Sequence, residues 1–158
     1  DTIKAEHGDD VIYGESGGDF IDGGKGNDVL HGGSGADTYY IERFDGFDRI
    51  IESGSSAADK IRFGDDVESE ELWFSRSGDD LRVDFLGSSN GVLVEDWYRR
   101  NTVEKFELGG GDYLTNSAVE QLVQAMAAFN IPASSDLSSS PMLASAIEPV
   151  IAAAWEAA

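Results

Sequence analysis

Five aspartates recur at intervals of nine residues at the start of this 158-residue chain. Each is followed two positions later by a large apolar or aromatic residue, and from the second onward each has a glycine two positions before it. Carboxylates and backbone carbonyls are the ligands that Ca²⁺ prefers, about six to eight oxygens at a time. The spacing therefore predicts a repeated set of calcium-binding turns. The aspartates are Asp1, Asp10, Asp19, Asp28 and Asp37.

A nine-residue unit is long enough for one turn and one short strand, so it cannot bury a core alone. Two units make one coil of a flattened solenoid, and stacked coils bury the apolar position of every unit. Turns on the same side of the solenoid come from units two apart. We therefore pair the turn at residues 5–10 with that at 23–28, and the turn at 14–19 with that at 32–37, with an ion between the layers of each pair.

The carboxylates of Asp10, Asp19, Asp28 and Asp37 are the predicted side-chain ligands. Glycine permits positive φ and close approach of the backbone, so carbonyl oxygens of the turns can supply the remaining ligands. A further ion above the turn at 23–28 would use Asp45 or Asp48, and we include Asp45; the alternative is an ordinary turn aspartate. The other predicted site residues lie in the turns: His7, Gly8, Asp9, Gly14, Ser16, Gly18, Gly24, Lys25, Gly26, Asn27, Gly33, Ser34, Gly35 and Ala36.

The units at residues 23–31 and 32–40 match the pattern G-G-x-G-x-D-x-U-x most closely. Over residues 5–40 the sequence resembles the repeats-in-toxin (RTX) family, whose members are secreted by type I machinery in Gram-negative bacteria. In the first units Ala5, Glu6 and Glu15 stand where the pattern has glycine. The resemblance implies Ca²⁺ as the cofactor and a secreted, extracellular protein.

The resemblance also implies an all-β fold, in which a right-handed parallel β-roll solenoid is followed by an antiparallel β cap with one or two C-terminal helices. We predict three parts. Residues 1–63 form the calcium-binding roll with irregular final rungs, residues 64–130 form a capping meander plus a helix, and residues 131–158 form a flexible linker and a C-terminal type I secretion signal.

The predicted cap has strands near residues 72–76, 81–86, 92–98 and 103–108. The period of two in residues 81–86 is typical of a half-buried strand. Residues 72–81 and 94–98 resemble the cap of RTX toxins of the adenylate cyclase–haemolysin type, where the cap is needed for calcium-driven folding. An aromatic ligand platform is the alternative to a core. The expected core residues are Trp73, Phe74, Phe85, Trp97 and Phe106.

Two helices are considered near the C-terminus. Ser117 and Glu120 form a capping box that predicts a helix over residues 118–129. Residues 130–141 are rich in serine and proline and read as a linker. Apolar residues at helical spacing follow, but Pro149 interrupts them, so at most a short, kinked helix is expected. The family resemblance implies a secretion signal there, and the alternative is a docked terminal helix.

Charge and composition limit the partners. The chain has 31 acidic and 11 basic residues, for a formal net charge of -20, which disfavours nucleic acid and anionic membranes. It has no cysteine, so disulfides cannot stabilise it. It has no apolar run of transmembrane length. Because residues 1–3 lie inside a repeat, we expect a C-terminal piece of a longer protein.

These features predict a calcium-binding folding and export module. It would be unfolded at low cytosolic calcium and would fold outside the cell from its cap, after passing through the type I secretion apparatus. The alternative is a receptor- or surface-binding, adhesin-like end of a large RTX protein that contacts a host-cell receptor. We expect no enzyme, because His7 and His31 sit at variable positions of their repeats and no H-E-x-x-H motif occurs.

Overall fold

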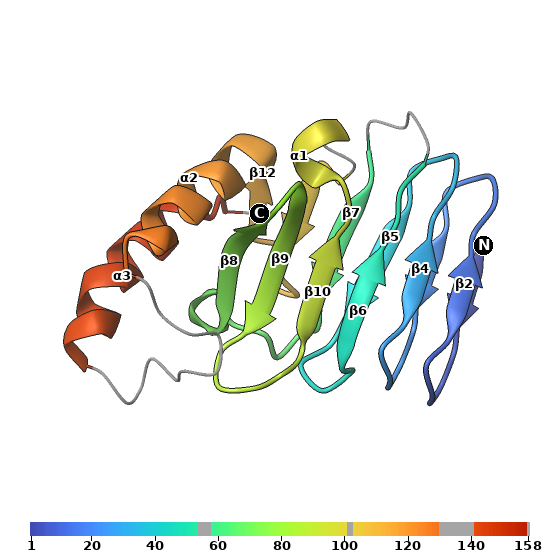
Figure 1. The fold of residues 1–158 in the computed structure, drawn as a ribbon, viewed down its shortest axis with the longest axis horizontal. Helices are drawn as coiled ribbons and strands as arrows, with labels where there is room; N and C mark the ends of the chain where they lie inside the picture. The colour runs from blue at the N-terminus through green and yellow to red at the C-terminus, as the bar shows by residue number, and fades with distance from the viewer. Residues whose placement is uncertain (54–57, 101–102, 130–140, 158) are drawn as a thin grey trace.

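The computed structural model describes residues 1–53, 58–100, 103–129 and 141–157. Twelve strands in this part of the chain form two six-stranded sheets that run along the molecule (Figure 1). The strands are β1 (Thr2–Lys4), β2 (Val11–Tyr13), β3 (Phe20–Asp22), β4 (Val29–His31), β5 (Thr38–Ile41), β6 (Phe47–Ile50), β7 (Lys60–Phe63), β8 (Leu72–Ser77), β9 (Asp80–Phe85), β10 (Gly91–Val94), β11 (Lys105–Glu107) and β12 (Tyr113–Thr115).

The first seven strands alternate between the two sheets. One sheet has the order β1-β3-β5-β7-β11-β12 and the other β2-β4-β6-β10-β9-β8. All pairs among β1 to β7 are parallel, with Ile3 opposite Ile21 and Ile12 opposite Leu30. Two units therefore make one coil, as the nine-residue period predicted, and the arrangement is consistent with a β-roll.

The centre of each short strand points into the space between the sheets. Ile21, Leu30 and Tyr39 are completely buried there, whereas the flanking residues Val11 and Tyr13 are largely exposed. This inside-out alternation follows from the period of two along a strand. Each nine-residue unit thus buries a single large side chain, which is a small core for so much ordered backbone.

The C-terminal strands continue both sheets instead of forming a separate antiparallel meander. β10 pairs in parallel with β6, and β11 pairs in parallel with β7. Among the strand pairs of the described residues, β8–β9, β9–β10 and β11–β12 are antiparallel. The predicted antiparallel meander over residues 64–114 was therefore wrong in part. Residues 91–94 and 105–107 pair in parallel with β6 and β7 instead.

The predicted aromatic core is confirmed: all five side chains are buried. Phe74 and Phe106 pack edge to face with ring centroids 5.8 Å apart. The strand predicted over residues 92–98 is shorter than expected: β10 ends at Val94, so Trp97 lies outside it. Trp97 begins the one-turn helix α1 (Trp97–Arg100), and its indole N–H donates to the carbonyl of Val103 at 3.1 Å.

A short 3₁₀ helix, η1 (Ser69–Glu71), precedes β8, and α2 (Asn116–Ala127) follows β12. The N-cap of α2 is Thr115, whose side chain accepts the N–H of Ala118 at 3.4 Å. The predicted cap at Ser117 was therefore wrong by two residues. The buried face of α2 consists of Val119, Leu122, Val123 and Met126.

The last helix is longer than predicted. α3 (Pro141–Ala154) runs for 14 residues with Pro149 inside it. It packs against α2, and Ile147 and Ile151 are fully buried (Figure 1). Burial of this apolar face offsets the hydrogen bond that proline removes. The linker was predicted over residues 130–141; residues 130–140 lie outside the described residues, and Pro141 begins α3.

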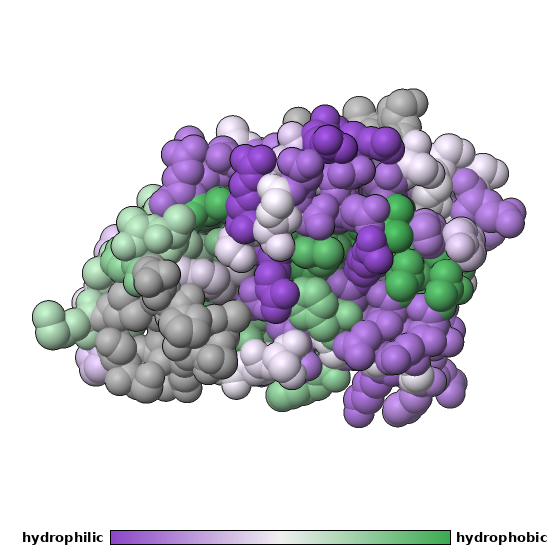
Figure 2. Space-filling model, viewed as in Figure 1, coloured by the Kyte–Doolittle hydropathy of each residue, from purple (hydrophilic) through white to green (hydrophobic). Residues whose placement is uncertain are grey.

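In Figure 2 hydrophilic side chains cover much of the strand face but leave hydrophobic patches among the strands, and moderately hydrophobic residues lie over the C-terminal helices. No helix within the described ranges has the length and apolar character needed to cross a membrane.

Candidate metal centre

The repeat aspartates stack in register along both edges of the sheets. On one edge the N–H of Asp10 donates to Oδ1 of Asp28 at 2.8 Å, and the N–H of Asp28 donates to Oδ1 of Asp48 at 3.0 Å. The turn at 5–10 therefore lies next to the turn at 23–28, and the next aspartate in the column comes from beyond the repeats.

The other edge carries a longer column. The N–H of Asp19 donates to Oδ1 of Asp37, and the N–H of Asp37 donates to Oδ1 of Asp59, both at 2.8 Å. The N–H of Asp59 then donates to Oε2 of Glu104 at 2.9 Å. One oxygen of each carboxylate is thus used to join neighbouring layers.

The second oxygens of Asp19, Asp28 and Asp37 have no hydrogen-bond partner, although these residues are at least 98% buried. A buried carboxylate oxygen without a donor is costly. Each points at the first glycine of its own turn: a Cβ on Gly23 would lie 2.3 Å from Oδ2 of Asp28, and one on Gly32 would lie 2.5 Å from Oδ2 of Asp37. These orphaned oxygens fit a bound cation.

Backbone carbonyls converge on the same turns. A Cβ on Gly26 would lie 2.0 Å from the carbonyl oxygen of Gly8, and one on Gly35 would lie 2.2 Å from that of Gly17. Both Gly26 and Gly35 have positive φ, at 151° and 134°. The glycines are therefore required both for the backbone conformation and for the room that the carbonyls occupy.

The electrostatics of the turns favour neutralisation. Burial raises the pKa of Asp28 and Asp37 above the ordinary value, even though each accepts a backbone N–H. Burial, with added repulsion from neighbouring carboxylates, raises the pKa of Asp48 to about 7 and that of Asp45 to about 6. A divalent cation would remove this repulsion.

The predicted pairing of turns is confirmed. His7 lies opposite Lys25 in a parallel bridge, and Ser16 lies opposite Ser34 in another. The N–H of Gly8 donates to the carbonyl of Lys25 at 2.7 Å, and the N–H of Gly17 to that of Ser34 at the same distance. The side chains at the variable turn positions are exposed, so these residues can offer an ion only their backbone: His7, Ser16, Lys25, Ser34 and Ala36.

Asp45 and Asp48 take different places. Asp48 is in register with Asp28 and continues its column. Asp45 lies in the preceding turn, where its carbonyl accepts the N–H of Gly26 at 2.6 Å and its Oδ2 accepts the N–H of Glu42 at 2.8 Å. Both aspartates precede an apolar residue by two positions, but Asp48, and not the predicted Asp45, is the structural equivalent of a repeat aspartate.

The repeat pattern gave no indication of Glu52 or Glu104. Glu52 is buried beside Asp37 and Asp59, and one oxygen of each of the three carboxylates lies within 4.8 Å of the others. Glu52 occupies the turn position that glycine holds in the repeats, so the consensus pattern could not point to it. Glu104 lies 45 residues from its partner Asp59, and no local signal connects them.

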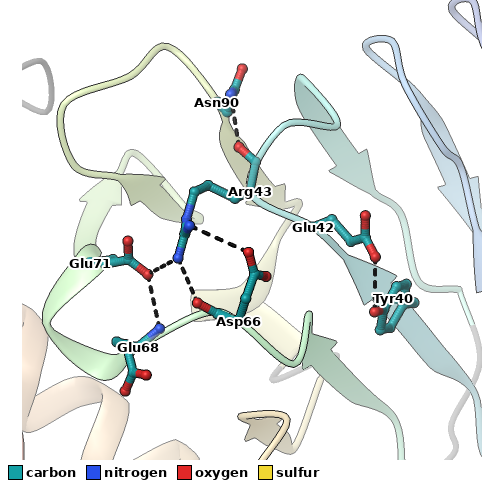
Figure 3. A network of polar contacts seen from close by, with 7 residues as sticks. All are labelled: Tyr40, Glu42, Arg43, Asp66, Glu68, Glu71 and Asn90. Carbon is teal, nitrogen blue, oxygen red and sulfur yellow. Dashed lines mark hydrogen bonds and ion pairs between the residues drawn. The ribbon is translucent and has the colours of Figure 1, made fainter.

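A polar network joins the turn at residues 42–46 to the loops that follow β7 (Figure 3). The guanidinium of Arg43 donates to the carbonyl of Asp66 and to Oε2 of Glu71, both at 2.6 Å. The side chain of Asn90 donates to the carbonyl of Arg43 at 2.8 Å. Arg43 thus ties the last turns of the repeat region to the strands beyond it.

Comparison with protein families finds four copies of the RTX calcium-binding nonapeptide repeat, matched over residues 1–21 and 13–40. Residues 1–40 are an RTX repeat block. Such repeats bind Ca²⁺, which agrees with the oxygen-rich, glycine-lined turns described above. The likeness of residues 72–81 and 94–98 to one group of RTX toxins stays a prediction.

Proposed function

We propose that this chain is the calcium-responsive folding and export module of a secreted RTX protein. The observation that carries the proposal is the set of buried Oδ2 atoms of Asp19, Asp28 and Asp37, which have no protein partner. Two carboxylates about 4 Å apart repel by roughly 4 kcal/mol at an effective dielectric constant near 20. A divalent ion between them reverses the sign of that interaction.

Calcium would then act as the switch for folding. A site whose dissociation constant is a hundredfold below the free calcium concentration stabilises the folded state by about 2.7 kcal/mol. Several such sites together match most of the stability of a small domain. At low cytosolic calcium the module would stay unfolded, and at the higher calcium level outside the cell it would fold.

We propose Asp10, Asp19, Asp28 and Asp37 as the carboxylate ligands, and backbone carbonyls of the paired turns at 5–10 with 23–28 and 14–19 with 32–37 as the others. Each of these carboxylates would have two roles. One oxygen accepts a backbone N–H of the adjacent layer, and the other faces the ion. Asp48 is a better candidate than Asp45 for a further site, because it shares the register of Asp28.

The three parts of the chain would divide the task. Residues 1–63 would form a right-handed roll, residues 64–130 its cap, and residues 131–158 a signal for a type I secretion apparatus of a Gram-negative bacterium. Folding from the cap is supported by β10 and β11, which offer parallel edges to β6 and β7. The alternative role as a receptor-binding end stays a prediction.

The proposal is tested by circular dichroism of the whole chain during a calcium titration. We expect the β-sheet signal to increase with Ca²⁺ and this increase to be lost on addition of a chelator. A matched titration with Mg²⁺ should restore little of it, because Mg²⁺ demands stricter geometry and dehydrates reluctantly. The same β-sheet content in chelator and in calcium would disprove the proposal.

A further inference from the structure

We propose a further cation site at the junction of the repeats and the strands that follow, where Asp37 of the last nonapeptide turn meets Glu52 and Asp59 of the next layer. The inference extends the proposed calcium response and shares Asp37 with it. All three residues are buried, and one carboxylate oxygen of each lies within 4.8 Å of the other two. Two oxygens on opposite sides of one Ca²⁺ are about 4.6–5.2 Å apart, so the three can share an ion.

One oxygen of this group is aimed into the site and has no partner. Asp37 is fully buried, and its Oδ2 makes no hydrogen bond. A Cβ on Gly32 would lie 2.5 Å from that oxygen and 2.4 Å from Oε1 of Glu52. The two carboxylates therefore converge on the same space, next to the glycine that opens the turn.

The register explains why Glu52 reaches this space. Leu30 pairs with Ile50, which places Glu52 in the layer next to Gly32. Tyr39 pairs with Ile61, which places Asp59 in the layer next to Asp37. In the layer beyond the last consensus turn, Glu52 therefore takes the position of the first glycine of a repeat turn. Asp59 takes the position of the repeat aspartate, so the layer has a carboxylate at both positions.

Tyr39 is a positioning residue for Glu52. It occupies the apolar position of its repeat, yet its hydroxyl reaches back to the turn, where it donates to Oε1 of Glu52. The N–H of Gly32 donates to the same hydroxyl at 2.8 Å. This chain of hydrogen bonds holds the Glu52 carboxylate toward Asp37.

The ligand set selects the class of ion. Three carboxylates offer only hard oxygen donors, which suit Ca²⁺ and not the softer metals that prefer nitrogen or sulfur. Three buried like charges repel one another strongly, and a divalent cation compensates most of that repulsion. Because the N–H of Asp59 donates to Glu104 at 2.9 Å, the ion would also join the last turn to β11 and its neighbours.

The test is the number of Ca²⁺ ions bound per chain at saturation, measured by equilibrium dialysis. The double variant Glu52→Gln/Asp59→Asn keeps acceptor oxygens for Tyr39 and for the N–H of Asp37 but removes two charges. We expect it to bind one ion fewer than the wild type. Asp65→Asn, whose parent side chain is 79% exposed, should bind the wild-type number.

A folded double variant with the wild-type number of ions would overturn the inference. If the variant fails to fold, a crystal structure of the calcium-loaded wild type decides, because the inference requires density for an ion between the three carboxylates. An ion there supports it, and its absence overturns it. A wild type that binds no Ca²⁺ at all would refute the proposed function as well, whereas filled nonapeptide turns beside an empty junction would refute this inference alone.

Discussion

The repeat region and the region from β8 to α2 are stabilised by different interactions. In the repeat region β2, β3 and β4 each bury one large side chain, such as Ile21 or Leu30, and the turns are lined by glycine and by carboxylates with orphaned oxygens. In the region from β8 to α2, aromatic side chains such as Phe74 and Phe106 pack against each other and against a helix face.

This comparison separates two sources of stability. Apolar burial depends little on dissolved ions, whereas stacked carboxylates repel until a cation joins them. The region beyond β7 can therefore form a platform whose stability is set by packing, and the repeats can be added to it when calcium is present.

The sharpest way to break the comparison is to remove calcium and follow amide hydrogen exchange. Two filled turn sites are worth about 5 kcal/mol, so we expect the amides of Ile12 and Leu30 to lose about ten-thousandfold in protection. The amides of Phe74 and Val83 should lose much less. Equal losses in both regions would show that the platform has no stability of its own.

Truncation of a core aromatic residue tests the other region. Trp97 is 2% exposed, so Trp97→Ala should lower the free energy of unfolding by about 3–5 kcal/mol at saturating calcium. Urea unfolding measures this change. Met142→Ala is the control, because that side chain is 87% exposed and should have almost no effect. An unchanged midpoint for Trp97→Ala would remove Trp97 from the core.

Protons should partly replace calcium in the repeat region. The raised pKa values of Asp48, about 7, and Asp45, about 6, exceed the ordinary value of 3.8, so the folded calcium-free state binds more protons than the unfolded state between about pH 4 and 7. Its stability should therefore rise as the pH falls through this window, by roughly 4 kcal/mol from about pH 8 to about pH 5. Circular dichroism in chelator measures it as the β-sheet signal recovered when the pH is lowered; a signal that decreases as the pH is lowered would contradict the prediction.

The repeat aspartates can be ranked by calorimetry. Asp28→Asn keeps the acceptor for the N–H of Asp10 but loses the charge, and we expect calcium affinity to fall by at least about tenfold. Asp1→Asn should change affinity less, because Asp1 is exposed and has only part of a turn around it. The reverse order would contradict the proposed ligand pairing.

The smallest expected effect concerns the connection between the two regions. Arg43→Met should cost about 1 kcal/mol, because its ion pairs with Asp66 and Glu71 are only partly shielded from water. We expect this loss of folding free energy to raise the calcium concentration at which half of the repeat region is folded. The matched control Arg49→Met breaks a more exposed pair with Glu95 and should have less effect. Equal shifts would remove Arg43 as a specific connection.

Much of the repeat region could be predicted from the sequence. Its strands, buried positions and turn pairing follow from a nine-residue period that each unit repeats locally. The aromatic core was also predictable, because residues such as Trp73 and Phe85 are large and apolar at strand spacing.

The junction could not be predicted in the same way. Asp45 and Asp48 both precede an apolar residue by two positions, and only the pairing of Asp28 with Asp48 separates them. Glu104 joins the carboxylate column through a partner 45 residues away. The length of α3 depended on a docking surface on α2 that outweighs the effect of Pro149.

The sequence alone determined the repeating unit, the identity of the ion and the side chains that face inward, because these depend on residue types at short, regular intervals. Only the tertiary structure decided where the carboxylate column ends, that β10 and β11 extend the sheets in parallel, and that Glu52 turns toward Asp37. Those outcomes depend on contacts between distant segments, whose free energy exists only once the layers are stacked.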